Sequence, residues 1–280
     1  MKLQQTVTGN KMQDLSFVSE NYSKRKPKDY RLSISIRRDG FSFLIMHKDS
    51  VMAYAYTNIS TDDRVAAFKN FLNQEILQQT FNAVSIIVVT PKFTVVPKKF
   101  YDESMLDSYA NLNFTKLDSE SIIDYQSIAD DSVILFPIET ELWTLCRIAY
   151  KGQELISYVP QVAPMLEANI RSKKPKMHIS VENTFCSAVI VKEKKLLFAN
   201  SFLFRNVNDF VYFVMNTFTQ LHLDPLQVDV ELSGKIGPKS PYFSALAMFV
   251  KNVTMASSSV KAEKFPFTLF YNNCNVALCE

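Results

Sequence analysis

The first clear pattern is an alternation of apolar and polar positions between residues 31 and 59. An alternation with a period of two is typical of a strand with one buried face. Two turn signals, Asp39-Gly40 and Lys48-Asp49-Ser50, divide the segment. The pattern therefore predicts a meander of three strands. The inward positions of its first two strands are Leu32, Ile34, Ile36, Phe41, Phe43 and Ile45.

After this meander the apolar period lengthens. Between Thr61 and Gln79 the apolar residues Val65, Phe68, Leu72 and Ile76 recur on one face of a helix. Thr61-Asp62-Asp63 offers a cap and favourable negative charge at its start. The β-branched run from Ser85 to Thr90 then predicts a fully buried strand.

The same order returns about 145 residues further along the chain. Residues 176–204 again predict three strands, followed by a helix over 208–221 and a buried strand over 228–232. Each half is therefore predicted to be β-β-β-α-β, and a duplication explains this better than coincidence among common α/β patterns. The expected organisation is a polar leader over 1–29, a first lobe over 30–172 and a second lobe over 173–280.

Other elements are predicted around this repeat. Residues 98–113 and 139–150 favour helices on either side of a strand over 133–138. A strand is expected over 155–159 and a helix over 161–171, and the apolar C-terminal tail is expected to dock against the core.

Composition limits the function classes. The 280 residues are 47% hydrophobic and 21% charged, which is typical of a globular protein. A net charge of +3 is too small for a dedicated nucleic-acid domain, so binding of nucleic acid is not expected. The chain has only five glycines, although phosphate-binding loops need them for close approach.

Location is also constrained by the sequence. The N-terminus has no continuous apolar segment of the secretory type, and no apolar run is long enough to span a bilayer. Three of the four cysteines, at positions 146, 186, 274 and 279, have apolar neighbours, as expected of reduced and packed thiols. The sequence therefore predicts a cytoplasmic protein without a membrane segment.

The duplicated meander, the segment Leu232-Ser-Gly-Lys-Ile-Gly237 and the terminal Cys279-Glu280 carry a resemblance to a known group. The chain resembles the actin-like ATPase superfamily, which includes actin, the sugar kinases and the heat-shock chaperone ATPases. More closely, it is similar to a family of uncharacterised bacterial proteins with this fold. The resemblance implies an α/β fold of two similar ribonuclease H-like lobes with a cleft between them.

Active members of the superfamily carry an Asp-x-Gly signature in each of two hairpins. The resemblance implies that the Asp would organise magnesium and the attacking water, and that the glycine would cradle phosphate. Here the first hairpin reads Ser35-Ile36-Arg37, with Asp39-Gly40 at its turn. The second contains Glu182 and Asn183 and has no glycine. Both hairpin signatures are thus degenerate.

A third superfamily site uses paired glycines against adenosine. The resemblance implies that Ser233, Gly234 and Gly237 form a diluted version of this site. Together with Arg37, Asp39, Gly40 and Glu182 in the hairpins, these are the candidate cofactor-binding residues. No catalytic residue, metal ligand or cofactor is expected, with ATP and magnesium as the alternative.

Several isolated residues allow a functional and a structural interpretation. Arg37 and Arg38 are candidate anion receptors if their hairpin faces the cleft. The alternation favours the other interpretation, in which Arg37 is a solvent-facing residue of its strand. Cys274 and Cys279 lack the second pair of ligands that a zinc site needs. Cys186 and His178 form an unsupported nucleophile–base pair, because no third group orients them.

The leading hypothesis is a non-catalytic binding or scaffold protein, a pseudo-ATPase whose partner is another protein. The alternative is a weak or divergent ATPase or kinase in which Asp39, Glu182 or another carboxylate holds the metal. The two differ in one feature: an active enzyme needs an acidic group directed at a magnesium-bound phosphate in the cleft.

Overall fold

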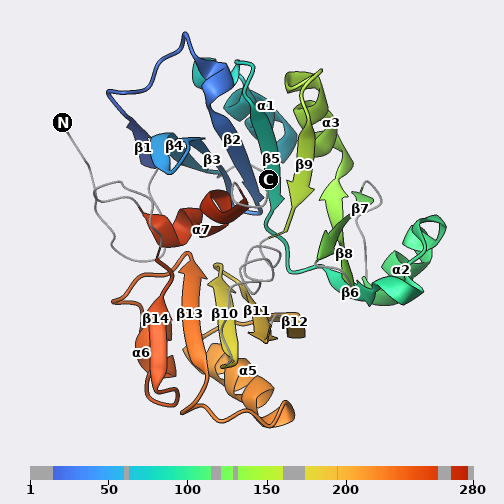
Figure 1. The fold of residues 1–280 in the computed structure, drawn as a ribbon, viewed down its shortest axis with the longest axis vertical. Coiled ribbons are helices and arrows are strands. Elements are labelled where there is room, and N and C mark those ends of the chain that lie inside the picture. Colours follow the sequence, from blue (N-terminus) through green and yellow to red (C-terminus); the bar gives the residue numbers. More distant parts are fainter. Residues whose placement is uncertain are drawn as a thin grey trace.

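A computed structural model describes residues 15–59, 63–114, 121–128, 132–159, 174–193, 195–257 and 266–276. The chain forms two α/β lobes, each built on its own sheet, with the helix α7 (Phe267–Val276) between them (Figure 1). A third, smaller sheet lies beside the first lobe.

The first lobe contains a sheet of six strands. Its inward positions Ile34, Ile36, Phe41 and Phe43 pack against α1 (Arg64–Leu72) and α3 (Thr140–Ala149). The strand order is β1 (Leu15–Val18), β4 (Ser50–Asn58), β3 (Gly40–His47), β2 (Arg31–Arg37), β5 (Ala83–Val88) and β9 (Leu155–Tyr158).

The small sheet is formed by chain that leaves the first lobe after β5 and returns at α3. Its order is β6 (Thr94–Pro97), β8 (Ser132–Glu139) and β7 (Ser121–Ile128), all antiparallel. The helix α2 (Leu106–Asn113) lies beside it, preceded by 3-10 turns at Lys98–Phe100 and Glu103–Met105.

The second lobe contains a sheet of five strands. Its order is β12 (Lys195–Leu203), β11 (Phe185–Lys192), β10 (Lys176–Val181), β13 (Asp229–Gly234) and β14 (Asn252–Met255). The helices α5 (Val207–Gln220) and α6 (Pro241–Leu246) pack on it through Phe210, Val214, Phe218 and Leu246.

The two lobes share a four-strand topology. In each, the meander is antiparallel and its first strand pairs in parallel with the strand after the helix. Both meanders shift register at an equivalent place, at Ile45/Met46 and at Ile190/Val191. Lys48 and Glu193 both take a positive φ of 50° in the following turn. A common origin by duplication stays a prediction.

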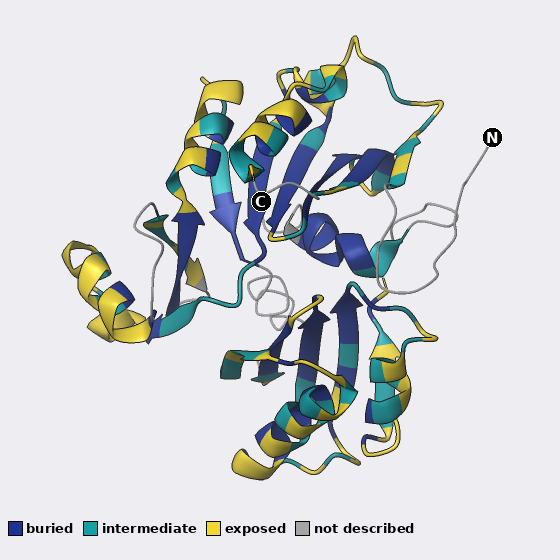
Figure 2. Ribbon diagram, turned by 180° about the vertical axis from the view of Figure 1, so that it is seen from behind, coloured by how far each residue is buried: buried dark blue, intermediate teal, exposed yellow. Residues whose placement is uncertain are grey.

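The helix α7 joins the lobes. It contacts β13 of the second lobe as well as β2, β3 and β5 of the first. The helix is buried from Leu269 to Asn275 and half-buried at Phe267 and Thr268, whereas the outer helices expose one face (Figure 2). The C-terminal segment thus docks on the core as expected, although it covers the first lobe as much as the second.

Some predicted boundaries differ from the structure. The helix expected over 61–79 ends at Leu72, where Asn73 caps it, and a 3-10 turn at Glu75–Leu77 follows. The expected leader contains β1, which pairs with β4, and a 3-10 turn at Pro27–Asp29. The helix expected over 161–171 lies outside the described residues.

No helix in the described ranges is both long enough and apolar enough to cross a membrane.

Candidate functional site: an interlobe polar network

The turn of the first hairpin faces the turn of the second across the junction of the lobes. The strand β2 ends at Arg37, which pairs with Gly40 across a two-residue turn. In the second hairpin the amide of Glu182 donates to the carbonyl of Phe185 across the corresponding turn. Arg37 and Glu182 therefore occupy equivalent positions, one in each lobe.

Arg37 is buried and extensively bonded. Its side chain is only 1% exposed and lies 3.6 Å from Glu182, measured from Nε to Oε1. Nη1 donates to Ser42 Oγ at 2.9 Å, and Nη2 donates to the carbonyl of Leu269 in α7 at 3.1 Å. The prediction of a solvent-facing Arg37 is wrong, because α7 covers the face that the alternation assigns to water.

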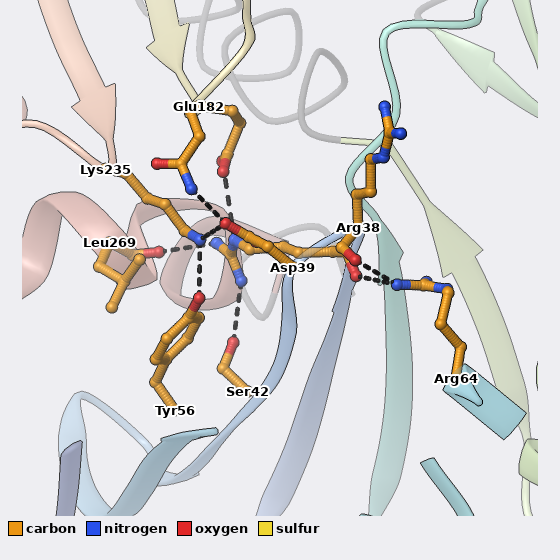
Figure 3. Close-up of polar contacts among 10 residues, drawn as sticks. Arg38, Asp39, Ser42, Tyr56, Arg64, Glu182, Lys235 and Leu269 are labelled. Atoms are coloured by element: carbon orange, nitrogen blue, oxygen red, sulfur yellow. Dashed lines mark hydrogen bonds and ion pairs between the residues drawn. The ribbon is translucent and has the colours of Figure 1, made fainter. Parts of the chain in front are cut away.

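A second pair of charges lies beside the first (Figure 3). Lys235, at the end of β13, donates from Nζ to Asp39 Oδ2 at 2.6 Å and to Tyr56 Oη at 2.7 Å. Asn183, in the turn of the second hairpin, also donates to Asp39 Oδ2. We call Arg37, Asp39, Asn183, Glu182 and Lys235 the interlobe network.

The charges of the interlobe network balance, with two cations and two carboxylates. Burial raises the pKa of Glu182 above its ordinary value, although Arg37 and Lys235 oppose that shift. Burial likewise lowers the pKa of Lys235, against the opposing effects of Glu182 and Asp39. Desolvation therefore outweighs pairing at both residues, as is common for ion pairs withdrawn from water.

These residues do not fit a magnesium-bound phosphate. Ser35 stands where the resemblance would place the carboxylate, and Arg37 stands where it would place the glycine. A salt bridge already uses the carboxylate of Glu182. Asp39 is bonded to Lys235 and Asn183. In the described part of the chain no group of three or more His, Cys, Asp or Glu residues is arranged to hold a metal.

The candidate glycines meet protein neighbours. A Cβ at Gly40 would lie 2.5 Å from the carbonyl oxygen of Thr57 and 2.9 Å from Tyr56 Oη. Gly234 has a φ of +91°, and a Cβ there would lie 2.3 Å from the carbonyl oxygen of Val181. Both glycines thus allow strands to pack closely. Gly237 differs, since a Cβ added there would meet no described atom within 4 Å.

Ser233 belongs to a different arrangement, with His178 and Glu231. His178 Nε2 lies 2.9 Å from Ser233 Oγ, and Nδ1 lies 3.2 Å from Glu231 Oε2. This order resembles a nucleophile, base and acid. However, Ser233 is fully buried, and Tyr271 of α7 stacks on the imidazole with ring centroids 4.4 Å apart. The arrangement therefore anchors α7 and is closed to a substrate.

The described cysteines lie inside the protein. Cys146, Cys186 and Cys274 are free and buried, and burial raises the pKa of each thiol. Cys186 pairs with Val181 across the hairpin, whereas His178 is bonded on the other side to β13. Cys279 lies outside the described residues. The described thiols therefore pack as small apolar side chains.

A pocket of about 440 Å³ opens beside the interlobe network. The first lobe contributes the ends of β2 and β5 and the start of α3, and the second contributes Thr184, Phe185 and Leu203. Arg64 closes one side: it forms a salt bridge of 2.9 Å with Glu139 and donates to the carbonyls of Arg37 and Arg38.

Several members of this site are not predicted by the sequence pattern. Lys235 stood inside the segment singled out for its glycines, but its partners belong to the other lobe. Ser42 and Tyr56 lie on the face of the meander opposite Phe41 and Phe43, and α7 covers that face. Polar groups buried there need hydrogen-bond partners, but the alternation alone assigns the face to water. Tyr54, on the same face, stacks on Phe17 of β1, and its ring lies against Phe270 of α7.

Comparison with solved structures defines the fold class. A protein of unknown function from Bacteroides thetaiotaomicron VPI-5482 with an actin-like ATPase fold matches with a TM-score of 0.76 at 21% identity, over 91% of this chain and 98% of that one. The PilM-PilN type IV pilus biogenesis complex matches with a TM-score of 0.60 at 12% identity, over 89% and 98%. The ethanolamine utilization protein EutJ from Carboxydothermus hydrogenoformans matches with a TM-score of 0.53 at 8% identity, over 93% of each chain. The chain thus has the actin-like ATPase fold.

The particular family is given by the sequence. Residues 19–253 match the family described as protein of unknown function, DUF3822, and the chain belongs to it. No curated protein matches the sequence significantly.

Proposed function

We propose that this protein is a non-catalytic binding or scaffold protein on the actin-like ATPase fold, whose partner is another protein. One observation carries the proposal: the interlobe network pairs two cations with two carboxylates where the facing hairpin turns meet the end of β13. Hydrolysis of a nucleotide would require preorganised groups that stabilise developing charge on the phosphate. The charges at this position are instead paired with one another.

The network also opposes the movement that an ATPase of this fold would use. Arg37 and Asp39 of the first lobe are bonded to Glu182, Asn183 and Lys235 of the second. The helix α7 adds contacts to both lobes. Its Asn273 bonds to Ser33 and Ser35 of β2 in the first lobe, and its Thr268 donates to the carbonyl of Ile236 in the second. A body with lobes tied together in this way suits a fixed binding surface.

Two features support a protein partner. The solved PilM-PilN structure is a complex that contains a protein of similar fold. In the second lobe Leu226, Met248 and Phe249 are 56%, 80% and 52% exposed. The amide of Lys251 donates to the carbonyl of Pro225, which brings their segments together. Clustered exposed apolar side chains are typical of interaction surfaces. The buried free thiols also agree with a cytoplasmic location.

The test is phosphate release from ATP with magnesium, for the wild type and for the variants Asp39→Asn and Glu182→Gln. We expect all three proteins to match the buffer blank. The proposal is overturned if the wild type releases phosphate and either variant abolishes that release. One of these carboxylates would then hold the metal, which favours the divergent ATPase or kinase.

A further inference from the structure

The pocket beside the interlobe network has the features of a ligand site. Its volume of about 440 Å³ falls in the range typical of pockets for small molecules. Apolar side chains form much of its wall, including Val88, Val89, Pro91, Phe185 and Leu203. Such a lining favours the apolar body of a ligand and would not by itself select a free inorganic ion.

The charged residues of the pocket are predominantly basic. Arg37, Arg38, Arg64 and Lys92 line it, with Glu139 as the one carboxylate among its described lining residues. Arg37 is paired with Glu182, and Arg64 is paired with Glu139. Of the pocket's cations, Arg38 is the exposed one that the proposal uses.

Arg38 is the residue best placed to meet a ligand. It is exposed, and its guanidinium points away from the interlobe network (Figure 3). Its backbone is fixed, because Arg64 donates to its carbonyl oxygen. An arginine of this kind can donate two parallel hydrogen bonds to a carboxylate or a phosphate.

We propose that this pocket binds a small organic anion, with an apolar body against the wall and an acidic group at Arg38. The inference goes beyond the proposed function and holds whether or not the protein turns over a nucleotide. Because both lobes line the pocket, such a ligand would contact each of them and stabilise their present arrangement.

The probe is 8-anilinonaphthalene-1-sulfonate, titrated against the full chain and followed by fluorescence. Its neutral counterpart, N-phenyl-1-naphthylamine, has the same aromatic body without the acidic group. We expect Arg38→Glu to weaken binding of the sulfonate about tenfold, as for the loss of a charged hydrogen bond, and to leave the neutral probe unchanged. Arg25→Glu, which reverses an exposed charge elsewhere, is the matched control and should change neither.

A second variant acts on the mouth of the pocket. Leu203 is 68% exposed, so the Leu203→Asp variant should fold normally. It should weaken binding of the sulfonate, because it places a like charge at the pocket. Displacement of the bound sulfonate by decanoate or by decyl phosphate identifies the acidic group that is preferred, and decanol is the neutral control. Equal binding of the sulfonate to wild type and Arg38→Glu would overturn the proposal, as would equal weakening by Arg25→Glu.

Discussion

Arg37 and Glu182 occupy equivalent positions in the two hairpins and form a buried ion pair with one another, 3.6 Å apart. In the superfamily these positions lie at the hairpins whose Asp-x-Gly signatures serve the nucleotide. In this chain opposite charges replace them, so that the two lobes contact each other through the residues at those positions.

The burial of this pair predicts a large effect on stability. Arg37→Ala leaves Glu182 buried without its cation and should lower the free energy of unfolding by about 3 kcal/mol or more. Arg38→Ala is the matched control, since this neighbouring side chain is exposed and its loss should change stability by less than about 0.5 kcal/mol. Urea denaturation measures both. Equal effects of the two substitutions would contradict the burial of Arg37.

Replacing both members of the pair should cost less than removing one. Arg37→Met combined with Glu182→Leu removes both charges and keeps similar apolar volume. We expect the double variant to be more stable than Arg37→Ala and close to the wild type, because no charge remains buried alone. The expectation fails if the double variant is as unstable as the sum of its single changes.

The raised pKa of Glu182 predicts a pH dependence with a definite sign. Its ordinary value is 4.5, and burial raises its pKa in the folded state. Between these two values the folded protein holds a proton that the unfolded chain has released, so the free energy of unfolding decreases as the pH rises. Glu182→Gln lacks this contribution. The measurement is the stability difference between wild type and Glu182→Gln from pH 4.5 upward, and a difference that favours the wild type more as the pH rises would contradict the shift.

The hydrogen bonds of Asp39 link the two hairpins, so their loss should make local opening of the hairpins easier. Asp39→Ala removes the acceptor shared by Lys235 and Asn183 and leaves Lys235, 5% exposed, without that partner. We expect faster amide hydrogen exchange in both hairpins, as local opening becomes easier. Asp49→Ala, in the exposed turn between β3 and β4, is the control and should leave exchange there unchanged. Unchanged exchange in Asp39→Ala would show that other contacts hold the lobes.

Gly234 and Gly237 should differ in how much stability is lost when each is replaced by alanine. Gly234→Ala would bring a Cβ within 2.3 Å of the carbonyl oxygen of Val181 at a φ of +91°, so it should lower stability by more than about 1 kcal/mol. Gly237→Ala meets nothing within 4 Å and should be nearly neutral. Thermal or urea denaturation separates them. A neutral Gly234→Ala would mean that this glycine does not serve strand packing.

Much of the fold was predictable because it depends on local periodicity. The meander over 31–59 and the helix beginning near residue 208 follow from side-chain spacing, and both are present. The strand Leu15–Val18 was missed because it is short and half exposed, and it is recognisable only by its pairing with β4. The helix over 64–72 was predicted too long because the apolar residues after Leu72 continue the same face in a 3-10 turn.

The candidate site depends on contacts between distant segments, which periodicity does not reveal. The sequence identified Arg37, Asp39 and Glu182 individually, through the hairpins that contain them. It did not predict that Lys235 would reach Asp39, or that α7 would cover Arg37. These contacts join residues of opposite lobes, so they depend on how the lobes dock. The expectation that these candidate residues hold no cofactor stays a prediction.

The central claim of the proposed function is that the two hairpins bond to each other and do not hold a nucleotide. Isothermal titration calorimetry of the full chain with ATP and with ADP, each with and without magnesium, tests it most directly. We predict no magnesium-dependent binding at millimolar nucleotide. Magnesium-dependent binding in the micromolar range that is lost in Asp39→Asn or Glu182→Gln would contradict the claim.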